Sequence, residues 1–204
     1  MKYVLKFFLI LFIISCEGSS SDCCVFPDLR EEIIINKGIF TVSYNEIYEQ
    51  PNWIEYSVSN RPKNVDRGNK NFYLEPGVKT SDNADYYKNE WDKGHLAPAA
   101  AFSCDKETLY KTFSYINSAL QHEGLNRGQW SKLESFERDA ANFFGKEVKV
   151  RVEVLFEGKL TVLPTGATVP SGFRKTITIG DVTKVFVFPN VDTKGTKWID
   201  YINK

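Results

Sequence analysis

The chain contains two histidines, and one of them lies in a stretch that could do chemistry. His95 stands in the segment EWDKGHLAPAAAF, from Glu90 to Phe102, between a charged pair and an apolar run. A histidine in this setting is a buried structural donor, a metal ligand or a general base, because it titrates close to physiological pH. A zinc site is disfavoured, since no histidine or cysteine pair has a ligand spacing. A structural donor and a general base remain as alternatives.

A second group of polar residues lies on the segment Asn126–Glu147, whose apolar residues recur at nearly helical period. On an α-helix, Glu134 and Arg138 would lie about 40° apart around the axis, and Asn126 about 80° from Glu134. An amide, a carboxylate and a guanidinium therefore share one side of the predicted helix. Taken alone, Glu134 and Arg138 are typical of a solvated ion pair, and Asn126 is typical of an N-cap.

The elements that would position these residues follow an α+β pattern. Gly145 is a plausible end for the predicted helix. The polar segment 61–84, with its prolines and glycines, indicates a long loop. Strands are predicted from runs of β-branched and aromatic residues. They cover 33–44 as a hairpin, 52–59, 112–117, 149–156, 159–163, 175–179 and 184–188.

Chain length and net charge limit the number of domains and the ways in which the protein could bind a polyanion. At 204 residues with 42% hydrophobic content, the chain can bury one sizeable core, which predicts a single domain. The formal net charge is zero, so no field over the whole molecule attracts nucleic acid. A polyanion would have to be held by a local cluster of cations.

The N-terminus is predicted to be an export signal. Lys2 and Lys6 precede an apolar run, 7–14, that is too short to span a membrane. The sequence IISC, ending at Cys16, resembles the lipobox of bacterial lipoproteins, which implies lipidation of that cysteine; plain secretion with cleavage nearby is the alternative. Residues 1–15 would be the signal peptide, 16–24 the lipidated cysteine and a flexible tether, and 25–204 the folded domain. We therefore expect an exported lipoprotein, anchored in a membrane and facing the periplasm or cell surface.

Three other cysteines remain. Cys23 and Cys24 are neighbours, and a bond between them would be strained. Pairing of one of them with Cys104 and a free thiol are both open from the sequence.

The two polar segments together resemble a known family. DKGHLAPAAAF, followed by YINSALQHEGLNRGQWSKLESFER, is similar to the DNA/RNA non-specific endonucleases, whose motifs read D-R-G-H-x-A-P, N-x-x-P-Q and L-N-x-G-x-W-x-x-L-E. The resemblance covers roughly residues 40–190. Lys93 stands where the family usually has arginine, and Leu120 replaces a proline. The resemblance implies an α+β fold with a mixed or antiparallel sheet core, a ββα-metal finger and a long active-site helix.

The resemblance also implies a metal-assisted site. His95 would be the general base that activates a water. Asn126 would be the one protein ligand of Mg²⁺, or of Mn²⁺ or another divalent cation, which is reasonable because Mg²⁺ commonly keeps several waters. Glu134 would hold a water of the ion's hydration shell.

The remaining site residues follow from the same resemblance. Arg138 and Lys93 would pair with the scissile phosphate. Asn117 would position the finger and His95 by hydrogen bonding. An upstream cation is also expected, Arg67 or, by one spacing, Lys70.

The implied function is metal-dependent hydrolysis of phosphodiester bonds in DNA, RNA or both, with little sequence specificity. The alternatives are a non-catalytic lipoprotein that binds nucleic acid or another polyanion on a nuclease scaffold, and a structural surface lipoprotein. Tyr86 or Tyr87, near the motif, is a candidate for stacking on bases, and His122 is predicted to be a surface loop residue. Neither an inhibitor protein nor an oligomeric state follows from the sequence.

Overall fold

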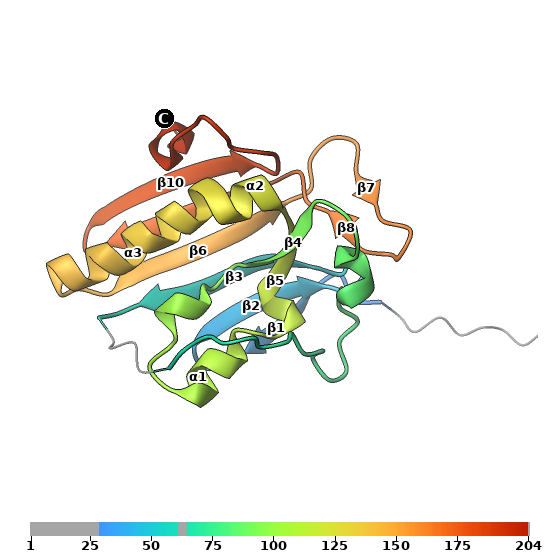
Figure 1. Cartoon of the computed structure of the whole chain (residues 1–204), viewed down its shortest axis with the longest axis horizontal. Coiled ribbons are helices and arrows are strands. Elements are labelled where there is room, and N and C mark those ends of the chain that lie inside the picture. The colour runs from blue at the N-terminus through green and yellow to red at the C-terminus, as the bar shows by residue number, and fades with distance from the viewer. Residues whose placement is uncertain (1–28, 61–64, 204) are drawn as a thin grey trace, which may run out of the picture.

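A six-stranded antiparallel sheet forms the base of the fold (Figure 1). The computed structural model describes residues 29–60 and 65–203. The export signal, Cys16, Cys23 and Cys24 lie outside these residues. The strands of the sheet, in spatial order, are β1 (Ile33–Asn36), β2 (Phe40–Asn45), β3 (Gln50–Val58), β6 (Val148–Leu155), β9 (Gly172–Ile179) and β10 (Val182–Pro189).

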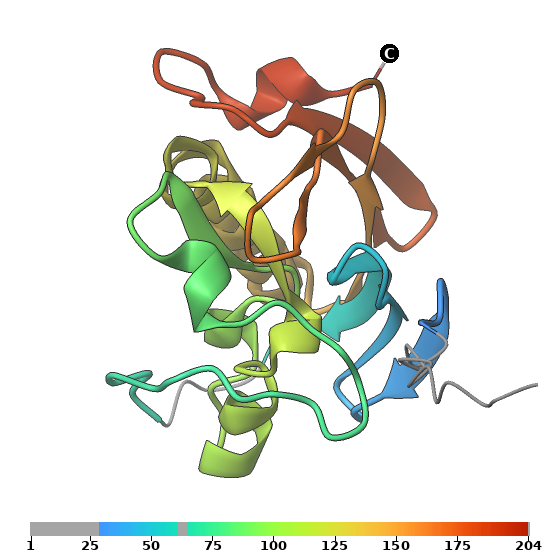
Figure 2. The same ribbon diagram turned by 90° about the vertical axis from the view of Figure 1, so that its right-hand side faces the viewer.

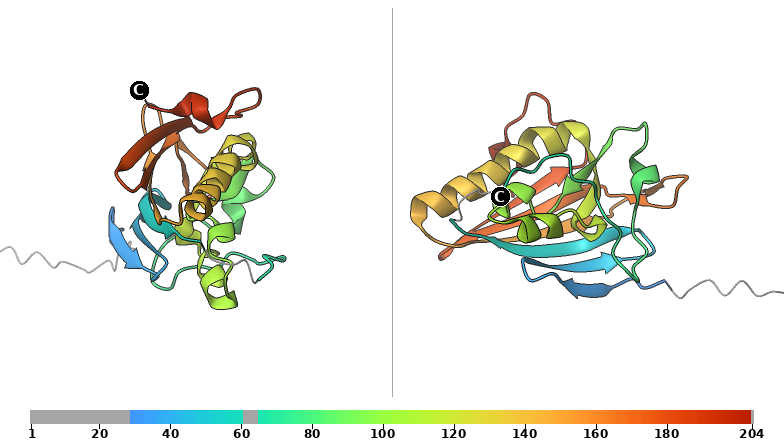
Figure 3. Two further views of the ribbon diagram at one scale, coloured as in Figure 1. Left: turned by 90° about the vertical axis from the view of Figure 1, so that its left-hand side faces the viewer. Right: turned by 60° about the horizontal axis from the view of Figure 1, so that its bottom comes forward.

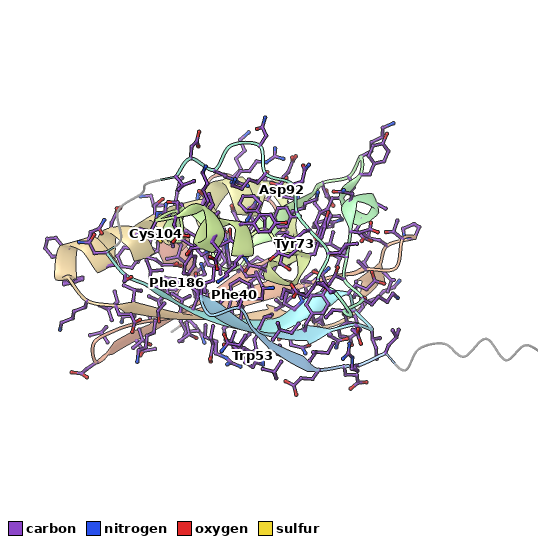
Figure 4. The ribbon with its side chains drawn as sticks, turned by 90° about the horizontal axis from the view of Figure 1, so that it is seen from below. Phe40, Trp53, Tyr73, Asp92, Cys104 and Phe186 are labelled. Atoms are coloured by element: carbon purple, nitrogen blue, oxygen red, sulfur yellow. The ribbon has the colours of Figure 1, made fainter. Side chains whose placement is uncertain are left out.

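One face of this sheet is buried and the other faces solvent. Along β6, Val148, Val150 and Val152 are buried, whereas the residues between them are at least partly exposed. This alternation is typical of an antiparallel sheet packed on one side. The helical layer covers the buried face (Figure 3). In Figure 4, Trp53 lies at the outer face of the sheet and Asp92 lies on the side of the helical layer.

The predicted finger is present as a strand pair followed by a helix. Strands β4 (Trp91–His95) and β5 (Ser118–His122) are antiparallel, with His95 opposite Ser118. The helical segment that follows ends in α3 (Ser131–Phe144). Figures 1 and 2 place both strands on the same side of the large sheet as α3. The prediction of an α+β fold with an antiparallel sheet, a ββα finger and one long helix is confirmed.

The start of the helix corrects the sequence prediction. The prediction of a single helix that starts at Asn126 is wrong, because the helical segment begins with α2 (Glu123–Leu125), followed by a π-helical turn, Asn126–Trp130. Gly128 leaves helical geometry there, with φ −97° and ψ −111°. The angle of 80° between Asn126 and Glu134 therefore does not apply. The other end is as predicted, since α3 stops before Gly145, which adopts a left-handed conformation with φ 59°.

The strand predicted over 112–117 is also wrong. Tyr115–Asn117 is a short 3-10 helix, and the strand begins one residue later. The side chain of Asn117 explains the difference, because its Nδ2 donates to the Thr112 carbonyl (2.9 Å) and so favours a turn over a ladder. The hairpin, the strand over 52–59 and the late strands are confirmed within a few residues.

Shorter elements fill the layer around the finger. The described part of the predicted loop, 65–84, contains no helix until a 3-10 helix begins at Asn83, and a bridge between Tyr73 and Ser114 connects it to the rest of the fold. None of the helices in the described ranges is long and apolar enough to cross a bilayer. The remaining elements are η1 (Asn83–Tyr86), η2 (Ala99–Ala101), α1 (Lys106–Lys111), β7 (Thr161–Val162), β8 (Thr168–Val169) and η5 (Trp198–Tyr201).

Candidate active site

His95 ends β4 and is buried, with 8% of its surface exposed. Its ring packs against Phe72 and Phe113, with centroid distances of 4.8 and 5.0 Å. Trp130 fixes the backbone here, because its Nε1 donates to the His95 carbonyl (3.3 Å). Within the described chain, the buried Nε2 of His95 has no hydrogen-bond partner. The structure therefore places the imidazole firmly while leaving one of its nitrogens unpaired.

The surroundings keep His95 uncharged. Burial, and to a lesser extent the positive charge of Arg67, lower the pKa of the imidazole from 6.5 to about 3. Desolvation disfavours the charged form of a buried group, and a nearby cation acts in the same direction. The ring is consequently neutral, and able to accept a proton, over the whole physiological range.

Asn126 lies at the start of the π-helical turn and is held by Asp92. Its Nδ2 donates to Asp92 Oδ2 (2.8 Å), and a carboxylate can only accept, so the amide nitrogen must face that group. The amide oxygen is thereby left for another partner. Arg127 completes the arrangement with a bidentate contact to Asp92 at 2.8 and 2.7 Å. The sequence had given Asp92 and Arg127 no role, although Asp92 is the acid of the DKGH motif.

Glu134 and Arg138 come from the first two turns of α3 and line the same cavity. They form no ion pair with each other in the described part of the chain, so the solvated-pair interpretation is wrong. Arg138 Nη2 instead donates to Ser135 Oγ (2.9 Å), and its buried Nη1 lacks a described partner. Burial raises the pKa of Glu134 from 4.5 to about 7, while Lys175 opposes this shift. The cavity thus contains a guanidinium whose Nη1 has no described partner, together with a carboxylate that is strongly desolvated.

The cavity that unites these residues has a volume of about 680 Å³. Of the two predicted upstream cations, Arg67 lines it, with its guanidinium 5.5 Å from the Phe113 ring centroid. Lys70 lines only the adjoining cavity. The geometry therefore brings Arg67 to His95, as the first choice from sequence had it. The cavity also contains Lys93, Asn126, Glu134 and Arg138.

Lys93 is held at the border between the two cavities. Its ammonium donates to Asn83 Oδ1 and lies within 6 Å of three ring centroids: Phe72 (5.6 Å), Tyr86 (5.7 Å) and Tyr115 (5.4 Å). Burial lowers the pKa of this amine. Lys93 keeps the positive charge that the family's usual arginine would supply, and its ammonium is held by the aromatic rings and by Asn83.

Asn117 acts on the chain that follows His95. Its Oδ1 accepts from the Ala97 amide (2.8 Å) and its Nδ2 donates to the Ala97 carbonyl (2.9 Å). No hydrogen bond joins its side chain to the His95 side chain in the described residues. The expectation that it positions the finger fits this geometry, and any effect on His95 passes through the backbone.

Two further buried amides hold β5, and sequence reasoning missed both. Gln50 Oε1 accepts from the Leu120 amide (3.0 Å). Asn190 donates to the Leu120 carbonyl (2.9 Å) and accepts from the His122 amide (2.8 Å). His122 is not in a surface loop: it ends β5, and its Nδ1 caps the next helix by accepting from Gly124 (3.0 Å). Asn190 stands at the end of the segment that resembles the family, and nothing else in the sequence pointed to it.

The donor set fits one weakly ligated divalent cation. The described residues contain no group of three or more His, Cys, Asp or Glu side chains that could hold a metal. A hard cation that keeps most of its waters needs only one or two protein oxygens. Asn126 Oδ1, freed by the Asp92 contact, is such an oxygen, and Glu134 lines the same cavity.

Cys104 is half-buried on the loop before α1 and forms no disulfide within the described residues. Its predicted partners lie outside them, so the pairing stays a prediction.

A ββα finger that presents a buried neutral histidine opposite an asparagine, a carboxylate and arginines defines the class of ββα-metal nucleases. The chain belongs to the DNA/RNA non-specific endonuclease family, whose sequence model matches residues 26–203.

Individual relatives agree with this assignment. The chain is 32% identical to Nuclease C1 of Cunninghamella echinulata var. echinulata over 180 residues, which cover 76% of this chain and 71% of that protein. It is 28% identical to the mitochondrial nuclease EXOG of Danio rerio over 59% of this chain, but spans only 38% of that protein. A solved structure of the EndoG/EndoGI complex has the same fold, with a TM-score of 0.76 and 22% identity over 88% of this chain and 82% of that one.

Proposed function

We propose that this chain is an endonuclease that hydrolyses phosphodiester bonds of DNA and RNA with little sequence specificity and with the help of a divalent cation. The observation that carries the proposal is the cavity in which the neutral His95 faces the same space as Asn126, Glu134, Arg67 and Arg138. A structural histidine would be expected to use both of its nitrogens in hydrogen bonds, which Nε2 does not do in the described chain.

His95 accepts the proton in this mechanism. A water loses a proton to the neutral imidazole as its oxygen forms a bond to phosphorus, and the bond from phosphorus to the 3′ oxygen breaks. Phe72 and Phe113 pack against the ring and hold it in place. The imidazolium that results is disfavoured by burial, so it returns its proton readily to solvent or to the leaving oxygen.

Positive side chains stabilise the charge that develops on the phosphoryl oxygens. Arg138 offers a buried Nη1 with no described partner, and Arg67 lines the same cavity. Fixed donors in a site shielded from water are effective, because they need no reorganisation during the reaction. Lys93, anchored by Asn83 and the aromatic cage, adds a third charge at the border of the cavity.

Asn126 and Glu134 would hold the divalent cation, Mg²⁺ or Mn²⁺. The ion, when bound, supplies positive charge to the phosphate and to the leaving oxygen. Asp92 orients Asn126 so that its Oδ1 points away from the carboxylate. Glu134 in its ionised form would hold water in the ion's shell.

A cleavage assay tests the proposal directly. Purified protein should cut supercoiled plasmid and a long RNA with Mg²⁺ or Mn²⁺, and EDTA should abolish both reactions. Asn126→Ala should weaken activity and raise the Mg²⁺ concentration needed for half-maximal rate. Asp92→Asn should do the same more mildly, because an amide can no longer enforce the Asn126 orientation. Tight nucleic-acid binding without cleavage under any metal would favour the non-catalytic alternative.

We further propose that the enzyme is exported as a lipoprotein anchored through Cys16. The support is the sequence alone: a basic start, a short apolar run and IISC. Mass spectrometry of the membrane fraction should find an acylated N-terminal Cys16, and a Cys16→Ser variant should lose the lipid. A mature N-terminus at another, unmodified residue would rule the anchor out.

A further inference from the structure

A second cavity, of about 720 Å³, adjoins the candidate active site. The two cavities share Arg67, Lys93, Asn126 and Arg127. A substrate strand at His95 would therefore continue into the second cavity without a gap. We call this cavity the stacking chamber. Its other lining residues are Lys70, Asn71, Phe72, Asn83, Tyr86, Tyr87, Trp91 and Asp92.

The chamber is rich in aromatic side chains, and one of them is strongly exposed. Tyr87 follows η1 and has 68% of its surface exposed, although its ring lines the chamber. The ammonium of the neighbouring Lys88 lies 5.0 Å from its centroid. Trp91, half-buried at the start of β4, also lines the chamber and packs edge-on to His122 (5.9 Å between ring centroids). Exposed rings beside a nuclease site are suited to stacking on bases.

The charge of the chamber suits phosphate. Lys70 and Arg67 form no ion pair within residues 29–60 and 65–203. The one carboxylate that lines the chamber, Asp92, is occupied by Arg127 (2.7 Å) and by the Asn126 amide (2.8 Å). Arg67 and Lys70 are thus free to bind an anion, whereas Arg127 and the acid of the chamber are already paired with each other.

We infer that the stacking chamber binds the nucleotide adjacent to the scissile phosphate, with its base against Tyr87 and Trp91 and its own phosphate at Lys70. This inference rests on the proposed nuclease function. A base can stack on a protein ring only after it leaves its neighbours in the strand, so the chamber selects single-stranded or locally unpaired substrates. Stacking accepts every base, in agreement with low sequence specificity.

A binding experiment isolates the chamber from the chemistry. In a His95→Ala background, which holds substrate without cutting it, a short single-stranded oligonucleotide is compared with a strand of the same length that lacks its bases. Base removal should weaken binding roughly 5- to 100-fold when Tyr87 is present, the range expected for one stacked base. In the His95→Ala/Tyr87→Ala protein, removing the bases should weaken binding much less. In the His95→Ala/Tyr87→Phe protein, base removal should again weaken binding as strongly as in His95→Ala alone, because the ring is retained.

A matched control is available on α3. Phe143 has 83% of its surface exposed, lies outside both cavities and contacts Phe144 (5.0 Å between centroids). His95→Ala/Phe143→Ala should behave like the background alone. Equal sensitivity to base removal with and without Tyr87 would overturn the inference.

Kinetics with otherwise wild-type enzyme give an independent readout. Tyr87→Ala should raise KM for single-stranded DNA with kcat nearly unchanged, because stacking is lost equally from the ground state and the transition state. KM for intact duplex should change less. A wild-type protein that cuts no nucleic acid would refute the nuclease proposal. If the wild type cuts normally and Tyr87→Ala leaves KM unchanged, only the inference about the stacking chamber is refuted.

Discussion

His95 shows how one residue can be rigid and reactive together. Rings on two sides and a hydrogen bond from Trp130 to its carbonyl fix its position. The same packing lowers the pKa of the imidazole to about 3, so the proton acceptor is never lost at physiological pH. A fall in activity near pH 6.5 therefore cannot be assigned to His95, as its ordinary pKa alone would have suggested.

Removal of the imidazole should separate chemistry from folding. His95→Ala is expected to lower kcat by roughly 10²- to 10⁴-fold, the usual contribution of a general base.

The lowered pKa of His95 also predicts a pH-dependent stability. In metal-free solution the wild type should lose stability as pH falls from 6.5 towards 3, because the unfolded chain binds a proton there and the folded His95 does not. This loss is at most about 1.4 kcal/mol per pH unit. Chemical denaturation across this range should show a shallower slope for His95→Ala, and equal slopes would contradict a buried neutral histidine.

Glu134 should give the opposite pH dependence of stability from that of His95. Its folded pKa of about 7 lies above the ordinary 4.5, so its favourable contribution is complete below pH 4.5 and is lost as pH rises through 7. Glu134→Gln, which is always neutral, should be more stable than wild type at pH 8 by about 1–3 kcal/mol in EDTA, and equally stable at pH 4. Its activity should be about 10–100-fold lower. A variant that is less stable than wild type at both pH values would argue against the raised pKa.

At the scale of elements, a buried ion pair joins α3 to the sheet beneath it. Lys175 on β9 contacts Glu137 on α3 at 2.7 Å, and both side chains are fully buried. Tyr56 on β3 donates to the second oxygen of Glu137 (2.8 Å). The Lys175 ammonium also lies 4.1 Å from the Trp130 ring centroid, and Trp130 in turn bonds the His95 carbonyl. The pair thus connects the sheet, through Trp130, to the backbone of His95, the proposed general base.

Breaking this pair should be costly, and removing both charges much less so. Lys175→Met and Glu137→Gln should each destabilise the protein by about 3–5 kcal/mol, because each single change leaves the partner charge buried and alone or unbalanced. The double variant should cost clearly less than the sum of the two. Urea denaturation of all four proteins measures the coupling. Strictly additive losses would show that the two residues do not interact.

At the scale of the whole molecule, any attraction for nucleic acid has to come from local clusters of positive side chains rather than from net charge. The chain carries 26 basic and 26 acidic residues, so it offers nucleic acid no general attraction. Cations line both the active-site cavity and the stacking chamber, and the two cavities adjoin each other. This arrangement predicts weak electrostatic steering but a salt-dependent site.

Salt titration should count these contacts. For single-stranded DNA bound to His95→Ala protein, log Kd should change with log salt by about 0.7 per phosphate contact, which gives a slope near 2–3 for three or four cations. Arg138→Ala should lower the slope by about 0.7. Arg174 pairs with Glu153 (3.2 Å) and lies outside both cavities, so Arg174→Ala should leave the slope unchanged. Equal slopes for Arg138→Ala and wild type would remove Arg138 from the phosphate site.

The sequence by itself determined the family and the fold class, and it supplied the candidate site residues, whose roles remain predictions. Motif spacing carried this information, because His95, Asn126 and Glu134 stand in short segments whose residue order is fixed by the local finger geometry. The hairpin, β3 and the helix end at Gly145 followed from period and turn chemistry, which are also local. The export signal and the Cys16 anchor rest on the sequence and remain predictions.

Only the tertiary structure decided how these residues are oriented and charged. The break at Gly128, the turn made by Asn117 and the capping role of His122 depend on contacts with distant segments or on side-chain bonds that periodicity does not encode. Asp92 could be recognised as the partner of Asn126 only once β4 lay beside the helical segment. The neutral His95 and the desolvated Glu134 arise from burial, and burial is a property of the packed molecule rather than of the neighbours of a residue in the chain.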